Sequence, residues 1–155
     1  MDTALKISFL AATAFTGILC GASLDQSFKQ LPARHRIGMI TFSAYAKAAD
    51  LKNGVLWYAI IGVGTALTTI ITAIIVWTNN QATNFSLPIY LAAIFSICHS
   101  ICTSQAAPTY FKQKGVSDEK SLEKIFKKFE IIQTIRSVFI VLNFISLIWA
   151  ISVQL

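Results

Sequence analysis

From Asn53 to Phe111 the sequence contains no Asp, Glu, Lys or Arg. A soluble domain of 155 residues could hardly bury such a run, whereas two membrane crossings of about 20 apolar residues each would account for it. Only 13% of the residues are charged, against about 25% in soluble domains. The net charge of +6 comes from cations that flank apolar segments, which indicates contact with anionic membrane lipids and argues against nucleic acid as a partner. We therefore expect an integral membrane protein.

Four apolar segments are long enough to cross a bilayer: residues 5–24, 54–77, 87–107 and 131–153. The first could instead be a signal peptide whose first 22 residues or so are removed, but Asp2 offsets Lys6 in its N-terminal region, which favours a retained span. The last follows a charged run from Ser117 without Gly or Pro, so one long helix is predicted there. The expected fold class is all-α: residues 1–155 form one transmembrane domain, an up-down four-helix bundle.

The basic residues predict the orientation of the bundle. All Lys and Arg except Lys6 and Arg136 lie in residues 25–53 and 108–130. Both of these loops are therefore expected in the cytoplasm, with both termini on the other side of a plasma or inner membrane. Within the first loop, apolar and cationic residues mix between Ile37 and Ala48, which predicts a short helix at the membrane surface.

Polar residues recur at helical spacing inside the apolar segments. In the fourth segment, Asn143 and Gln154 fall within about 20° of Arg136 on a helical wheel, and Gln133 lies one turn before Arg136. Such a stripe should face other helices or a wet cavity. Two partners stay open for Arg136: an ion pair with Asp25, or lipid phosphates reached by its long side chain.

The second and third segments carry polar groups of their own. Tyr58 and Thr65 are seven residues apart in the second, and His99 and Thr103 are four apart in the third. A mid-span histidine is either a hydrogen-bonded packing residue or a functional one. The expected ligand-binding residues are Tyr58, Thr65, His99, Thr103, Gln133, Arg136 and Asn143. No cofactor motif is present, and Cys98, His99 and Cys102 on one helix are too few ligands for a metal, so neither is expected.

Glycine and proline mark two further features. Gly17 and Gly21 form a GxxxG pattern, which predicts the close approach of a second helix. Pro88 is expected to open the third span, and Pro108 to lie near its end.

The order of these parts resembles the anthrone-oxygenase-like family of small four-span membrane proteins. In that family the fourth helix typically carries Trp, His and Arg as WxxxHxxR, and the aligned positions here are Phe129, Gln133 and Arg136. The family's Pro-x-Asn after the third span is read here as Pro108, Thr109 and Tyr110. The resemblance implies a four-span bundle and a cofactor-independent oxygenase of aromatic substrates.

Three functions are compatible with the sequence. The first is binding of a hydrophobic or lipid-like ligand between the helices. The second is the oxygenase activity that the resemblance implies, with His99 and Arg136 as candidate catalytic residues. The third is a structural role, as a partner subunit of a membrane complex or as a homo-oligomer.

Overall fold

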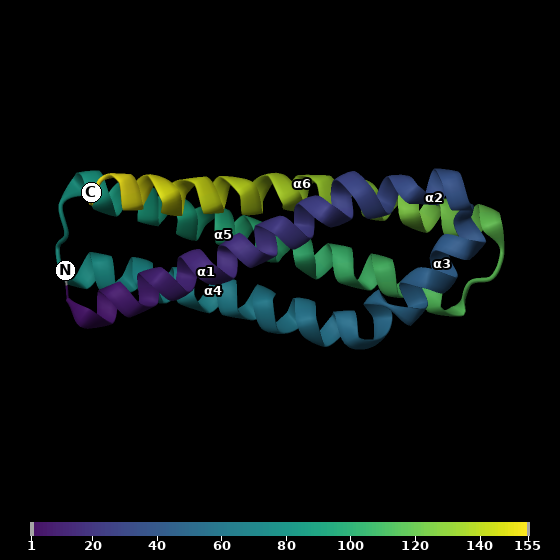
Figure 1. Ribbon diagram of the computed structural model, residues 1–155, viewed down its shortest axis with the longest axis horizontal. Coiled ribbons are helices and arrows are strands. Elements are labelled where there is room, and N and C mark those ends of the chain that lie inside the picture. The colour runs from purple at the N-terminus through teal and green to yellow at the C-terminus, as the bar shows by residue number, and fades with distance from the viewer. Residues whose placement is uncertain (1, 155) are drawn as a thin grey trace.

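A computed structural model describes residues 2–154, which form an all-α bundle with no strand in that range. Four long helices run up and down: α1 (Thr3–Asp25), α4 (Val55–Thr78), α5 (Thr83–Phe111) and α6 (Glu119–Ser152). Figure 1 shows the N- and C-terminal ends together at one end of the bundle, with the short helices at the other. We call the second end the basic end, because residues 25–53 and 108–130 carry most of the Lys and Arg. The predicted fold class is confirmed.

The segment between the first two long helices is almost entirely helical. The π-helical turn η1 (Gln26–Gln30) continues α1 into α2 (Leu31–Ile37). At Gly38 the chain reverses with a φ of +83°, which glycine adopts without a Cβ clash. The short helix α3 (Met39–Ala48) follows, and a second π-helical turn, η2 (Asp50–Gly54), leads into α4. A short helix in this loop is confirmed, and its position at a membrane surface stays a prediction.

Pro88 does not open the third long helix, contrary to the sequence-based prediction, whereas Pro108 lies three residues before its end, as expected. α5 begins at Thr83 and ends at Phe111, so Pro88 and Pro108 both lie inside it. A proline inside a helix costs about 3 kcal/mol through one lost hydrogen bond and a ring clash. Both prolines lie next to buried residues, Phe85 and Ile89 near Pro88 and Tyr110 near Pro108.

Apolar side chains cover the outside of the bundle as well as its inside. Large exposed apolar residues occur on all four long helices, for example Leu10, Leu67, Ile97 and Val138. Each long helix, with its short extensions, is long and apolar enough to cross a membrane. An apolar surface on every helix suits lipid and not water. The chain is therefore a multi-pass membrane protein with four spans.

The interior contains three clusters of buried apolar residues. One lies toward the chain termini and includes Leu5, Phe85 and Leu147. A small middle cluster is formed by Leu19, Cys20, Ile61 and Ile140. The third, here called the basic-end core, joins α2, α3, α5 and α6, and consists of Leu31, Phe42, Ala46, Ala106, Tyr110, Leu122, Phe126 and Phe129. At about 1.5 Å per residue, α6 is about 50 Å long, so it exceeds a hydrocarbon core of about 30 Å and extends into the basic end.

The GxxxG pattern predicted a close approach of a second helix at both Gly17 and Gly21, and the structure shows it at only one of them. A Cβ added at Gly17 would lie 3.1 Å from Phe144 Cε2 on α6, but at Gly21 it would have no neighbour within 4 Å. The tightest approach is at Gly64 on α4, where a Cβ would lie 2.8 Å from Phe15 Cε1 on α1. One glycine of the predicted pair therefore contacts another helix, and the other is exposed.

Candidate functional site: a cavity beside Arg136

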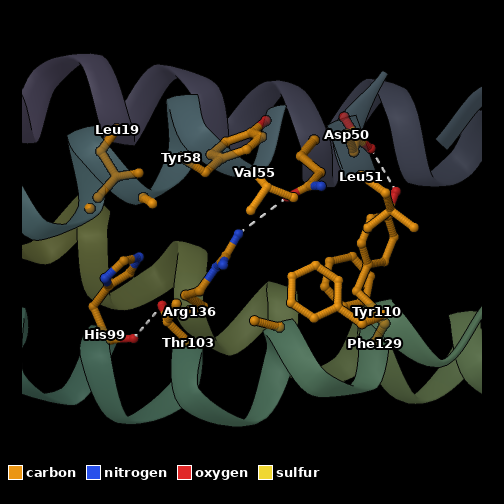
Figure 2. Close-up of a pocket in the computed structure, with 15 residues that line it drawn as sticks. Leu19, Asp50, Leu51, Val55, Tyr58, His99, Thr103, Tyr110, Phe129 and Arg136 are labelled. Atoms are coloured by element: carbon orange, nitrogen blue, oxygen red, sulfur yellow. Dashed lines mark hydrogen bonds between the residues drawn. The ribbon is translucent and has the colours of Figure 1, made fainter. Parts of the chain in front are cut away.

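A cavity of about 290 Å³ lies among the four long helices in the half of the bundle toward the basic end (Figure 2). Every long helix contributes to its wall, and η2 closes one end. Most of the wall is apolar. The residues that line it are Leu19, Gln26, Asp50, Leu51, Val55, Tyr58, Ala59, Gly62, His99, Thr103, Ala107, Tyr110, Phe111, Phe129 and Arg136.

Arg136 is the cation of this cavity. Its Nη2 donates a hydrogen bond of 3.2 Å to Gln26 Oε1 on η1, and its buried Nε has no protein acceptor. Within residues 2–154 no carboxylate lies within 4.0 Å of the guanidinium. Its partner in the protein is therefore a neutral amide.

The ion pair between Asp25 and Arg136 that the sequence left open does not form. Asp25 instead pairs with Lys29 and accepts a hydrogen bond of 2.7 Å from Gln30 Nε2. Successive helical residues point about 100° apart, so where α1 passes into η1 the side chains of Asp25 and Gln26 point in different directions. Gln26 is the one that contacts Arg136 of α6.

His99 stands beside Arg136 on the neighbouring helix. In Figure 2 the imidazole and the guanidinium both extend into the cavity, from α5 and α6 respectively. The His99 side chain is buried, and its Nε2 has no partner in the protein. Its backbone carbonyl accepts a hydrogen bond of 2.9 Å from Thr103 Oγ1, which keeps that hydroxyl on its own helix. The cavity wall thus has a ring nitrogen that no protein group occupies.

The end of the cavity nearest the basic-end core is closed by a tyrosine–aspartate contact. Tyr110 Oη donates a 2.6 Å hydrogen bond to Asp50 Oδ2, which ties α5 to η2 (Figure 2). The Tyr110 ring packs against Phe129 of α6, with ring centroids 4.3 Å apart. This end is held by a charged hydrogen bond and by aromatic packing together.

The cavity opens sideways, between α4 and α5. Val55 and Phe111 on its rim are 37% and 38% exposed, and Ala59, one turn along α4 from Val55, is exposed too. These rim residues are apolar, so the opening suits acyl chains better than water. Gly62 also lines the wall, and a Cβ there would meet nothing within 4 Å. Part of the free space therefore exists because residue 62 has no side chain.

Four of the residues predicted to bind a ligand line this cavity: Tyr58, His99, Thr103 and Arg136. The other three are buried elsewhere in the bundle. Gln133 links α6 to α1, because its Nε2 donates to Ser23 O of α1 at 3.3 Å, and it also donates to Ser137 Oγ on its own helix at 3.2 Å. Thr65 Oγ1 and both amide atoms of Asn143 are buried without a protein partner, away from the cavity wall.

The polar stripe of the fourth span is buried in most of its length. Gln133 and Asn143 are fully buried between helices, as the wheel predicted, whereas Gln154 lies beyond the end of α6 and is exposed. A stripe of polar residues predicts which side of a helix faces the inside of the bundle. It does not predict whether those residues pack against another helix or line a cavity. Gln133 lies about 60° from Arg136 around the helix, which turns it toward α1.

Sequence reasoning missed Gln26, Asp50 and Tyr110 at the cavity. Asp50 offered a signal, since it is an acidic residue just before the second apolar span, and Tyr110 ends the third span on the same side. The contact between Asp50 and Tyr110 could have been expected, because both residues lie at the same end of neighbouring spans. Gln26 gave no comparable signal, because it follows the more conspicuous Asp25.

The described residues 2–154 contain no group of three or more His, Cys, Asp or Glu side chains placed to hold a metal ion. Comparison of the chain with protein-family models, curated proteins and solved structures finds no match. The function is therefore inferred from the geometry of the cavity.

Proposed function

We propose that this membrane protein binds a hydrophobic, lipid-like small molecule in the cavity beside Arg136. The observation that carries the proposal is the cavity itself: mostly apolar walls from all four spans, polar groups contributed by several helices, and exposed apolar residues on its rim. Ligand sites typically combine an apolar wall with a small number of polar groups that orient the ligand. Arg136, His99 and Tyr58 would supply those groups here.

The volume limits the ligand. About 290 Å³ lies just below the range of about 300–1,000 Å³ for small-molecule sites. A single acyl chain or a small ring system fits this size better than a two-chain phospholipid. The remainder of a longer chain would leave through the opening between α4 and α5 and lie among the bilayer lipids.

The proposal is tested by filling the cavity. Leucine at residue 62 would extend into the free space without meeting backbone, since a Cβ there has no neighbour within 4 Å. The matched control is Gly21→Leu, because Gly21 also has no neighbour within 4 Å but is exposed on α1 and does not line the cavity.

Each purified variant is washed in excess detergent, and the lipid that remains is extracted and quantified per mole of protein by mass spectrometry. We expect wild type and Gly21→Leu to retain the same molecule, and Gly62→Leu to retain at least tenfold less of it. Equal retention in all three proteins, or none in wild type, would contradict the proposal.

We also propose an orientation in the membrane, with the basic end in the cytoplasm and both termini opposite, in a plasma or inner membrane. The excess of Lys and Arg at one end of the bundle supports it. Tags at the two termini, probed with a protease in intact cells and in inverted vesicles, test this orientation. A tag cleaved only from the cytoplasmic side would refute it.

A second candidate function is a cofactor-independent oxygenase of aromatic substrates. The unoccupied Nε2 of His99 favours it, because a buried imidazole in a cavity wall can accept a proton from a phenolic or activated C–H group. Arg136 would then stand next to the developing anion. Oxygen uptake with an anthrone, compared between wild type and His99→Gln, tests this function, and uptake no faster than in detergent alone would exclude it.

The role as a partner subunit or homo-oligomer stays a prediction. Cross-linking of the full chain in native membranes tests it, because a protein that acts as a monomer would yield no cross-linked species above its own mass.

A further inference from the structure

We infer that the ligand of the cavity is a single-chain amphiphile with one negatively charged head group, held by Arg136. This inference rests on the proposed function and names the ligand class for that same site. A carboxylate and a phosphodiester both supply the required single charge. The inference follows from the charges around the cavity, from the hydrogen bonds of the guanidinium, and from the size and opening of the space.

The first step is the missing counter-charge. Two ion pairs occur within residues 2–154, Lys29 with Asp25 and Arg34 with Glu130. Arg136 has no such partner, although it lies in a membrane-spanning helix. An unpaired charge in a low-dielectric interior is costly, and an anion that binds next to it recovers much of that cost. A ligand with a negative head group would therefore gain more from this site than a neutral one.

The second step is the hydrogen-bonding capacity of the guanidinium. Its planar fork carries five N–H donors and suits two-point contact with carboxylate or phosphate oxygens. One hydrogen bond, from Nη2 to Gln26, is made to the protein, and Nε has no protein acceptor. Arg136 lines the cavity, and the protein takes up only part of the hydrogen-bonding capacity of its guanidinium (Figure 2).

The third step limits the ligand to one charge. Asp50 also lines the cavity, at the end closed by Tyr110, and no cation within residues 2–154 lies within 4.0 Å of its carboxylate. A carboxylate at that end repels a second negative group. The two ends of the cavity therefore favour one negative charge at Arg136 and none near Asp50.

The fourth step concerns the tail of the ligand. The rim formed by Val55, Ala59 and Phe111 is apolar and exposed, so a hydrocarbon tail can pass between α4 and α5. With about 290 Å³ available, one chain fits and two do not. A head group at Arg136 with a tail through this opening satisfies both the polar and the apolar parts of the wall.

The test compares pairs of probes that differ in charge. The full chain is placed in nanodiscs of zwitterionic phosphatidylcholine, and native mass spectrometry measures the binding of four single-chain probes. Oleate and oleoyl-lysophosphatidylglycerol carry one negative charge, and oleyl alcohol and monoolein are neutral. The two anions distinguish a carboxylate head group from a phosphodiester one.

Wild type is compared with Arg136→Gln, which removes the charge, and with Arg136→Lys, which keeps it. The matched control is Arg36→Gln, because Arg36 is an exposed cation at the same basic end and does not line the cavity. We expect wild type and Arg36→Gln to bind at least one anion tenfold or more tightly than its neutral counterpart. In Arg136→Gln the ratio of anionic to neutral binding should fall to near one, and Arg136→Lys should keep part of the preference.

Failure of this inference can be told apart from failure of the proposed function. If no probe binds wild type, both are wrong. If the neutral probes bind as well as the anions, or if Arg36→Gln loses the preference as fully as Arg136→Gln does, the cavity binds lipid but Arg136 does not select its charge. If Arg136→Gln does not fold, the ratios in wild type, Arg136→Lys and Arg36→Gln still decide, because a ratio near one in wild type overturns the inference.

Discussion

The contact between Gly64 of α4 and Phe15 of α1 makes a quantitative prediction about helix packing. An alanine at residue 64 would place its Cβ 2.8 Å from Phe15 Cε1 and 2.9 Å from Cδ1, whereas carbon atoms pack at about 3.5–4.0 Å. The ring must move, and overpacking of this kind costs about 1–3 kcal/mol. The gain in helix propensity from Gly to Ala returns about 1 kcal/mol. Gly64→Ala should therefore lower the free energy of unfolding by about 0–2 kcal/mol.

Gly21→Ala is the matched control, because it carries the same propensity gain and meets nothing within 4 Å. It should be more stable than wild type by about 0.5–1 kcal/mol. The difference between the two variants, about 1–3 kcal/mol, is the cost of the contact alone. Unfolding in mixed micelles with increasing fractions of dodecyl sulfate, followed by circular dichroism, measures both midpoints.

A double variant links the effect to the ring. Phe15→Leu should restore part of the stability lost in Gly64→Ala, so the two changes should not be additive. If Gly64→Ala and Gly21→Ala shift the midpoint equally, or if Phe15→Leu and Gly64→Ala are additive, the close approach of α1 and α4 is not as described.

Two further predictions concern the basic end. Glu130→Gln should lower the free energy of unfolding by about 1–3 kcal/mol. The reason is that Arg34, which is 3% exposed, would keep Leu31 O as its acceptor but lose its carboxylate partner. An unchanged unfolding midpoint would contradict this prediction. At the start of α6, Asp118 Oδ1 accepts a hydrogen bond of 2.8 Å from the Ser121 N–H, and this bond lowers the pKa of the Asp118 carboxyl below its ordinary 3.8. Since the folded pKa is depressed, the cap stabilises the helix above pH 3.8 and is lost as the pH falls through the lower folded value. Hydrogen exchange at Ser121, corrected for intrinsic rate, should accelerate in that acid range in wild type but show no such step in Asp118→Asn, and the same step in both proteins would refute the assignment.

The sequence predicted the features that depend on the solvent around the helix. The run from Asn53 to Phe111 without charge, and the clustering of Lys and Arg, reflect the bilayer directly, so the four spans and the up-down order followed from them. The inward side of α6 followed from helical periodicity, because Gln133 and Asn143 are costly in lipid and are buried in the bundle.

Features that depend on a particular neighbour could not be predicted in the same way. Gly64 carries no pattern that distinguishes it from Gly62 two residues earlier, yet one packs against a ring and the other leaves the cavity open. Likewise Arg136 bonds to Gln26 and not to Asp25, a choice made by the local direction of one side chain. The position of Pro88 was misjudged because α5 begins five residues earlier, at Thr83, and the residues of that extra turn are buried only in the assembled bundle.

The length of α6 has a mechanical consequence. From Glu119 to Ser152 it is one helix without glycine or proline, so it behaves as a stiff rod. Phe129, which the Tyr110 ring contacts, lies two turns from Arg136 on the same face of α6. A shift of α6 at Phe129 would therefore also move the backbone that carries Arg136, which links the aromatic contacts of the basic end to the position of the guanidinium in the cavity.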